Sequence, residues 1–278
     1  MPVEAFSAAG NLLPDAIRPR WGAPANVAAL MSTRQGGVSR APFDSLNLRP
    51  PGLPGLPGSE ADDPTAVLQN QRRFAAALGA RPVWLNQVHG VQVLRLHAGM
   101  PPDALPQADA SVCTEPGIAC AVLVADCLPV LLCTDDGSGV GAAHAGWRGL
   151  AGGVLDNTVS ALCQTTGRVP ADVLAWLGPC IGPDAFEVGE DVLRAFAADP
   201  TRPDPGLFLG RRRADGSAAW LANLPALARQ RLLALGVTRI SGGGWCTVGE
   251  ASRFFSFRRD RRTGRLAAGI ALRSSGPL

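Results

Sequence analysis

The sequence predicts an α+β fold in which a mixed β-sheet is covered by helices on the outside. Helix-like and strand-like segments are interleaved, but some strand-like segments follow one another as hairpins, unlike the regular alternation of a doubly wound fold. The most apolar stretch, residues 118–133, is interrupted by Asp126, Cys127 and Pro129, which predicts two buried strands that meet at a polar point. The sequence contains no internal repeat, no G-x-G-x-x-G motif and no Walker loop.

The first clear element along the chain is an amphipathic helix. Asp62 or Asp63 can cap its start, Pro64 suits its first turn, and Gly79 suits its end. Its buried stripe, at helical spacing, consists of Val67, Gln71, Phe74 and Leu78.

The other elements follow from periodicity and from turn residues. The segment up to residue 24 is expected to hold a strand and loops, and further loops are expected at residues 31–48 and at the Pro/Gly-rich stretch 50–58. Strands are expected at residues 83–88, 91–96, 140–144, 173–177, from 240 onward, 254–257 and 266–272. Helices are expected at residues 149–166, 191–198 and 221–235.

The length allows one large domain or two closely packed halves, and we expect one folded domain over residues 1–278. The 46% hydrophobic and 18% charged fractions are typical of a globular protein. The formal net charge of +3 is too small to indicate a nucleic-acid partner, and all 26 cationic side chains are Arg. The most apolar stretch falls short of the roughly 20 residues that span a bilayer, so no membrane segment is expected.

The cysteines and the N-terminal residues indicate a cytoplasmic protein. The seven Cys are an odd number and include no C-x-x-C pair, which favours reduced thiols. Residues 1–11 lack the basic stretch and the following apolar run of a secretory signal.

Three residues stand out as candidates for chemistry. His89 and His144 are two of only three His, and each lies where an expected strand runs into a Gly-containing turn. Cys127 lies at the break between the two most apolar strands. Small neighbours allow a metal or a substrate to approach the backbone closely. His97, the third His, follows an alternating strand without a motif around it and is expected to be a non-ligand.

The chemistry of this set leaves three interpretations open. Two imidazoles and one thiolate suit zinc and leave a fourth position for water or substrate, as in catalytic zinc sites. A Cys–His pair can instead form a nucleophile and its base. The third interpretation is that the three residues are ordinary components of the core.

Seven sequence blocks, taken in order, resemble those of one known family. They are S-T-R-Q-G-G-V-S at 32–39, S-L-N-L at 45–48, N-Q-V-H-G at 86–90, A-D-C-L-P at 125–129, A-H-A-G-W-R-G at 143–149, G-P-C-I at 178–181 and F-F-S-F-R-R-D at 254–260. Together they resemble the multicopper polyphenol oxidase (laccase-like) family, which includes purine nucleoside phosphorylases.

This resemblance implies a fold, a metal site and an activity. The fold is an αββα sandwich, and the metal is zinc held by His89, Cys127 and His144, with copper less favoured because one soft-ligand site does not supply several copper centres. The activity is phosphorolysis of purine nucleosides such as adenosine, inosine, guanosine and methylthioadenosine, together with possible adenosine deamination.

Four further residues are candidates for binding or catalysis. Arg34, beside a Gly-Gly turn, and Arg148, just before an expected helix, are candidates for phosphate binding. Asn47 is a candidate for hydrogen bonding to ribose or base. Asp126 is a candidate for orienting a His ligand or for moving a proton. A structural role is the competing interpretation for each of the four.

Other functions remain open at this stage. The family also holds proteins described as peptidoglycan editing factors, and a Cys–His amide hydrolase of this kind would use Cys127 as nucleophile and His144 as base. A copper-dependent polyphenol oxidase and a non-enzymatic partner protein are the remaining alternatives.

Overall fold

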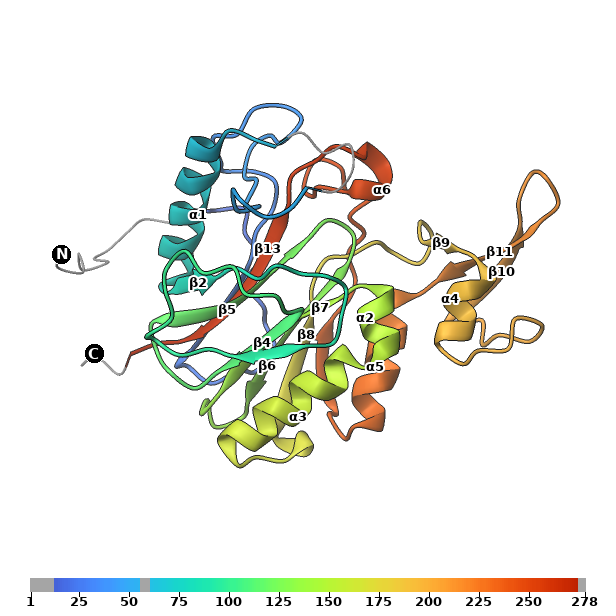
Figure 1. Cartoon of the computed structure of the whole chain (residues 1–278). Helices are drawn as coiled ribbons and strands as arrows, with labels where there is room; N and C mark the ends of the chain where they lie inside the picture. The colour runs from blue at the N-terminus through green and yellow to red at the C-terminus, as the bar shows by residue number, and fades with distance from the viewer. Residues whose placement is uncertain (1–12, 56–60, 275–278) are drawn as a thin grey trace.

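The computed structural model describes residues 13–55 and 61–274 of the chain (Figure 1). The segment 1–11, in which the sequence shows no secretory signal, lies outside the described residues, as do residues 56–58 of the Pro/Gly-rich loop. In the described part of the chain, no helix combines the length and the apolar character needed to cross a bilayer.

Two mixed sheets form the centre of the molecule. The larger sheet has six strands in the order β12 (Arg239–Gly242), β8 (Val173–Leu177), β6 (Leu128–Thr134), β7 (Val140–Ala145), β4 (Ala110–Cys113) and β3 (Val93–Arg95). The smaller sheet has four strands in the order β1 (Val27–Met31), β13 (Leu266–Leu272), β5 (Ile118–Val124) and β2 (Arg81–Val83). Each sheet contains both parallel and antiparallel pairs.

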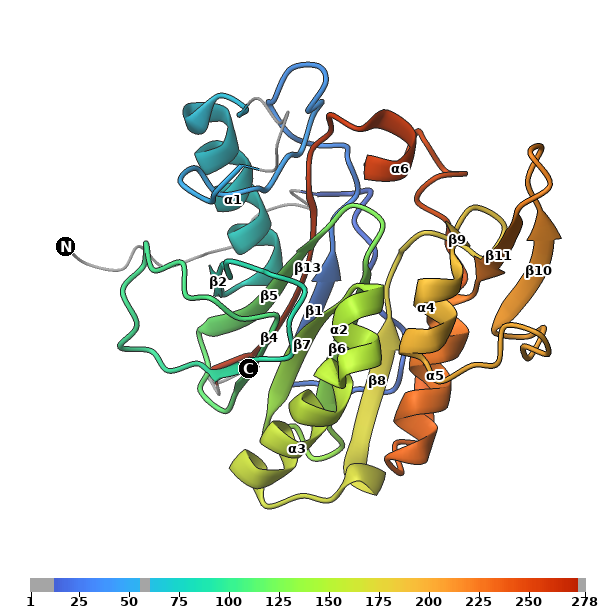
Figure 2. The same cartoon turned by 45° about the vertical axis from the view of Figure 1, so that its right-hand side comes forward.

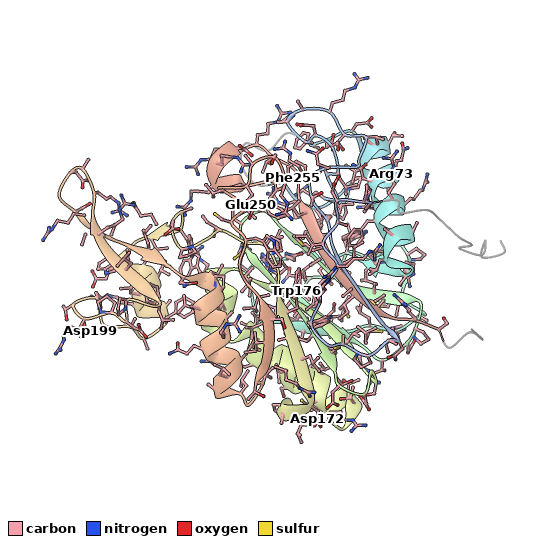
Figure 3. All side chains as sticks on the ribbon, turned by 180° about the vertical axis from the view of Figure 1, so that it is seen from behind. Arg73, Asp172, Trp176, Asp199, Glu250 and Phe255 are labelled. Atoms are coloured by element: carbon pink, nitrogen blue, oxygen red, sulfur yellow. The ribbon has the colours of Figure 1, made fainter. Side chains whose placement is uncertain are left out.

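The two sheets face each other across an apolar core. Cys120, Val122 and Ile270 of the four-stranded sheet pack in one cluster with Leu131 and Trp176 of the six-stranded sheet. In Figure 3, Trp176 lies near the middle of the molecule. β5 and β6 are buried along their whole length, because each contributes side chains to cores on both of its faces.

Helices cover the outer faces of the sheets. α1 (Pro64–Leu78) packs on the four-stranded sheet through Phe74 and Leu78. α2 (Trp147–Gly152), α3 (Val154–Thr166) and α5 (Leu224–Ala234) pack on the six-stranded sheet, on the other side of the molecule (Figure 1). The predicted αββα sandwich is therefore confirmed.

α1 begins and ends where the sequence indicates. The side chain of Asp63 accepts a hydrogen bond from the Thr65 amide at 2.9 Å, and Gly79 adopts the left-handed conformation with φ of 78°. One position of its predicted stripe is wrong. Asn70, not Gln71, is the fully buried polar residue of this face.

Four predicted segments are wrong in type or extent. The strand expected at 83–88 overlaps β2 at Val83 only, and the other three differences have a local cause. The helix expected at 149–166 is two helices, because Gly153 has φ of 98° between α2 and α3. Residues 254–257 are not a strand: the Ser256 side chain caps α6 (Phe257–Asp260) instead. The helix expected at 221–235 starts late, because β11 (Ala218–Ala222) precedes the helix cap at Asn223.

A smaller unit projects from the six-stranded side. Its antiparallel sheet has the order β10 (Phe208–Arg212), β11 and β9 (Glu187–Val188), and α4 (Glu190–Ala195) packs beside it. Figures 1 and 2 show β10 and β11 reaching away from the main body. A short 3-10 turn, η1 (Pro170–Asp172), precedes β8.

Candidate metal centre

The chain passes from the four-stranded to the six-stranded sheet twice, and each passage carries a candidate ligand. His89 lies in the loop between β2 and β3, and Cys127 lies in the turn between β5 and β6. His144 lies in β7, paired with Pro129 of β6. Because β6 and β7 are antiparallel neighbours, the residue before β6 and the last residues of β7 lie at the same end of the sheet. Three residues distant in sequence thus converge.

The three side chains are close enough to share one ion. The Sγ of Cys127 is 3.7 Å from the Nε2 of His89, and the ring centroids of His89 and His144 are 4.8 Å apart. One ligand atom from each residue lies within 4.8 Å of the other two. Tetrahedral zinc with Zn–S near 2.3 Å and Zn–N near 2.0–2.1 Å separates neighbouring ligand atoms by about 3.5 Å. The donor set and its spacing therefore fit zinc with small side-chain adjustments.

Asp109 holds two of the candidate ligands in place, and the sequence analysis missed it. Its Oδ1 accepts a hydrogen bond from Nδ1 of His144 at 2.8 Å, which leaves Nε2 of that ring for a metal. The same carboxylate accepts the backbone N–H groups of Val88, His89 and Gly90. Three successive N–H donors fix the loop at His89, whose φ of 60° is uncommon for a residue other than glycine.

The electrostatics of the cluster favour a thiolate. Burial raises the pKa of Cys127, but the charge of His144 and hydrogen bonds from His144 and His89 outweigh burial and bring this pKa down to about 6. Burial lowers the pKa of His144, but the charge of Cys127 and the hydrogen bond to Asp109 outweigh it, so the pKa is raised. The described cysteines Cys113, Cys120, Cys133, Cys163 and Cys180 differ, because burial raises their pKa. A metal thiolate or a nucleophile is available at Cys127.

Glycine at position 146 leaves room for the cluster. A Cβ at this position would lie 2.9 Å from Cδ2 of His89 and 3.0 Å from Sγ of Cys127. The backbone here has φ of −63° and ψ of 157°, which any residue can adopt. Space, and not backbone conformation, therefore requires glycine, as the small neighbours of His144 in the sequence suggested.

A cavity of about 610 Å³ opens onto the three residues. This volume is within the range of small-molecule sites. Its wall is partly apolar, through Leu85, Leu123, Ile181, Phe186 and Leu224. Its cationic residues are Arg49, Arg148, Arg258, Arg261 and Arg265. The cavity combines an apolar wall with several positive charges beside the candidate metal ligands.

The structure places Asp126 on the cavity wall but gives its carboxylate other partners. Asp126 lies in the turn between β5 and β6, with φ of 93°, at the break that the sequence predicts between the two apolar strands. Its Oδ1 accepts the hydroxyl of Thr247 at 2.6 Å, and its Oδ2 accepts the N–H of Arg258 at 2.7 Å. Asp126 therefore joins this turn to the start of α6, whereas Asp109 contacts the His ligand.

Arg34 and Asn47 do not line the cavity of the three ligands. The Arg34 guanidinium donates to the Asp44 carboxylate at 3.2 Å and to the Ala251 carbonyl at 3.0 Å. Asn47 is 2% exposed and donates to Asp62 at 2.9 Å. Both side chains already have structural partners.

Arg148 does line the cavity. Its guanidinium lies 4.2 Å from the ring centroid of Trp147 and is exposed to solvent. The sequence analysis placed Arg148 just before a helix, but the residue lies within α2.

Comparison with known proteins identifies relatives over nearly the whole chain. The chain is 47% identical over 262 residues to a purine nucleoside phosphorylase of Pseudomonas aeruginosa, a match that covers 91% of this chain and 96% of the relative. It is 48% identical over 259 residues to the purine nucleoside phosphorylase YfiH of Escherichia coli, covering 92% and 98% of the two chains.

Solved structures have the same fold. The crystal structure of protein NMB0706 of Neisseria meningitidis superposes with a TM-score of 0.80 at 43% identity, covering 94% of this chain and all of that one. YlmD of Geobacillus stearothermophilus superposes with a TM-score of 0.78 at 34% identity, covering 92% and 96%. The family model described as multi-copper polyphenol oxidoreductase laccase matches residues 28–273. On this match and these relatives, the chain belongs to the multi-copper polyphenol oxidoreductase laccase family.

Proposed function

We propose that this protein is a zinc-dependent purine nucleoside phosphorylase. The observation that carries the proposal is the convergence of His89, Cys127 and His144 beside a cavity with an apolar wall and several Arg. Relatives at 47% and 48% identity are named purine nucleoside phosphorylases. We propose adenosine, inosine, guanosine and methylthioadenosine as substrates, with phosphate as the second substrate.

Zinc is the metal that the donor set suits best. Two imidazoles and one thiolate, with an open fourth position, are typical of catalytic zinc sites. Within the described residues, the three side chains form one such group, whereas a copper oxidase that reduces dioxygen needs several centres. Bound zinc would polarise a substrate oxygen or lower the pKa of water, and the latter would also suit adenosine deamination.

The residues of the chain have distinct roles in this proposal. Asp109 orients the ring of His144 and fixes the loop that carries His89. Phe186 and Leu224 provide apolar surface suited to a purine face. The Arg side chains provide the positive charge that phosphate needs as it approaches an electron-poor sugar carbon.

The test is a nucleoside cleavage assay with and without phosphate. Purified protein with inosine or adenosine should release hypoxanthine or adenine, with equimolar ribose 1-phosphate, only when phosphate is present. The His89→Ala variant should lose both this activity and its zinc. A rate that is the same with and without phosphate would contradict phosphorolysis, and ammonia release independent of phosphate would show deamination.

A Cys–His amide hydrolase is the second candidate, because the lowered pKa of Cys127 also suits a nucleophile. A thiolate bound to zinc is a poor free nucleophile, so metal content separates the two functions. One zinc per chain that survives dialysis, with alkylation of Cys127 only after chelation, would exclude the hydrolase. Oxygen uptake with a phenol, dependent on copper, would instead favour an oxidase.

A further inference from the structure

Two of the five Arg that line the cavity differ from the other three in burial. Arg148, Arg258 and Arg261 are exposed, whereas Arg49 and Arg265 are partly buried. In the part of the chain that the structure describes, neither Arg49 nor Arg265 forms a salt bridge with a carboxylate. Two partly buried positive charges without an anionic partner are costly unless an anion joins them.

One buried side-chain amide joins the backbones of the two Arg. The Oδ1 of Asn47 accepts the backbone N–H of Arg49 at 3.2 Å and the backbone N–H of Arg265 at 2.8 Å. The N–H of Leu48 also donates to the carbonyl of Arg265 at 3.0 Å. These bonds hold together two backbone segments that are far apart in sequence, and both Arg line the same cavity. Asn47 thus has a role near the site although it does not line the cavity.

Each guanidinium is anchored at one nitrogen only. Nη2 of Arg49 donates to the carbonyls of Leu53 and Pro54, and Nη1 of Arg265 donates to the carbonyls of Thr263 and Gly264. Within the described residues, Nε and the other terminal nitrogen of each Arg have no hydrogen-bond partner. The free Nε and Nη2 of Arg265 are adjacent donors that suit two oxygens of a phosphoryl group, whereas Nε and Nη1 of Arg49 point in different directions and suit single hydrogen bonds.

The positive charges of Arg49 and Arg265 repel each other. Burial lowers the pKa of Arg49, and burial followed by the charge of Arg49 lowers the pKa of Arg265. The charges of Cys127 and Asp126 raise the pKa of Arg265 in turn, so this guanidinium is within electrostatic range of the candidate ligands. An anion between the two Arg would relieve the repulsion.

We propose that Arg49 and Arg265 form the subsite for inorganic phosphate beside the candidate metal centre. This rests on the proposed phosphorolysis, and it places phosphate at neither Arg34 nor Arg148. A phosphoryl group could also arrive as part of a nucleotide, and the test therefore includes both forms. The exposed Arg258 and Arg261 lie at the same cavity and would attract anions towards it.

The kinetic test uses the variants Arg49→Met, Arg265→Met, Arg49→Lys and Arg265→Lys. At saturating inosine, each Met variant should raise KM for phosphate at least tenfold, whereas zinc content and KM for inosine stay within twofold. The Lys variants should lie between, because an ammonium keeps the charge but not the planar set of N–H donors. The control is Arg212→Met, on the exposed β10 strand, which should match the wild type.

A binding test does not depend on turnover. At constant ionic strength, phosphate should raise Tm of the zinc-loaded wild type more than chloride does, and this shift should be absent in both Met variants. Adenosine 5′-monophosphate should give no larger shift than phosphate. Protection by the nucleotide but not by phosphate would overturn the assignment to inorganic phosphate.

The outcomes separate the subsite from the proposed function. If the wild type cleaves nucleosides with phosphate but the variants keep the wild-type KM for phosphate, the subsite is wrong and the function stands. If the wild type shows no phosphate-dependent cleavage but phosphate protects it and not the variants, the subsite stands and the function is wrong. Should Arg265→Met not fold, Arg49→Met and Arg265→Lys carry the test.

Discussion

At the scale of single residues, the candidate metal centre depends on side chains that are not ligands. Asp109 is completely buried, yet its carboxylate has four hydrogen-bond donors around it, one from the ring of His144 and three from successive backbone N–H groups. Burial of a carboxylate is costly, and these donors with the His144 charge outweigh that cost and lower the pKa of Asp109. The position of His89 and the direction of His144 are thus set by one side chain.

We expect the Asp109→Asn variant to bind zinc about 10- to 100-fold more weakly than the wild type, as is typical for partners of metal ligands. The amide keeps one acceptor oxygen but turns an N–H₂ towards backbone N–H donors, so the loop at His89 loses its anchor. Competition with a chromophoric chelator measures the affinity. Asp156→Asn, which breaks a surface ion pair with Arg231, is the control. An unchanged zinc affinity in Asp109→Asn would contradict this role.

Gly146 provides a second test at this scale. We expect Gly146→Ala to weaken zinc binding at least tenfold, because the added methyl group would lie 2.9 Å from His89 and 3.0 Å from Cys127. Its backbone angles suit Ala, so any loss comes from crowding. Gly244→Ala is the matched control, since a Cβ there meets nothing within 4 Å. The same chelator competition decides, and equal affinities of the two variants would show that the cluster tolerates the methyl group.

At the scale of elements, α1 does more than cover the four-stranded sheet. Asn70 is fully buried on its inner face and donates to the carbonyls of Ser45 and Asn47, and its Oδ1 accepts the N–H of Val38. The helix therefore fixes the loop that leads to Arg49.

We expect Asn70→Leu to lower the free energy of unfolding by about 3 kcal/mol, because it leaves several buried backbone groups without partners. Denaturant unfolding monitored by circular dichroism gives this value. Gln69→Leu, one position earlier on the exposed face of α1, should change stability by less than about 0.5 kcal/mol. If both variants unfold at the same denaturant concentration, the side chain of Asn70 does not anchor the loop.

The sequence predicted elements well where the signal is local. Both ends of α1 follow from Asp63, Pro64 and Gly79, and the bounds of β8 and β13 match the predicted segments. Local signals also misled: the aromatic residues at 254–257 suggested a strand, but Ser256 caps α6, and Phe254 and Phe255 are buried without joining a sheet.

The site was predictable in part, for a related reason. The strand ends and the Gly neighbours of His89 and His144 are local features, and the structure brings these residues together with Cys127. Asp109 could not be found in this way, because its partners lie 20 and 35 residues away along the chain. A lone Asp between Ala residues before an apolar strand is the only trace it leaves in the sequence. The partnership of Arg49 and Arg265 depends on an even longer separation, which only the fold closes.

At the scale of the whole molecule, the candidate ligands connect the two sheets. Cys127 follows β5 of the four-stranded sheet and precedes β6 of the six-stranded sheet, while His89 lies between β2 and β3. A bound ion would therefore cross-link the two passages that lead from the four-stranded to the six-stranded sheet.

We expect removal of zinc by a chelator to lower Tm by about 8 °C, since free zinc at 1,000 times Kd stabilises by about 4 kcal/mol and a chain of this size shifts by about 2 °C per kcal/mol. Differential scanning calorimetry measures the shift. The His89→Ala variant should show little difference with and without the chelator. An equal chelator effect in wild type and variant would mean that the metal acts elsewhere.

Because the candidate ligands lie on chain segments that connect the two sheets, the geometry of the metal site depends on how the sheets are placed relative to each other. With cobalt in place of zinc, the visible spectrum would depend on the angles between donors carried by different layers. A repacking of the interlayer core at residues that are not donors, for example at Trp176 or Ile270, should then change the colour of the protein. A shift of one sheet relative to the other could then be detected in the absorption spectrum although every ligand is kept.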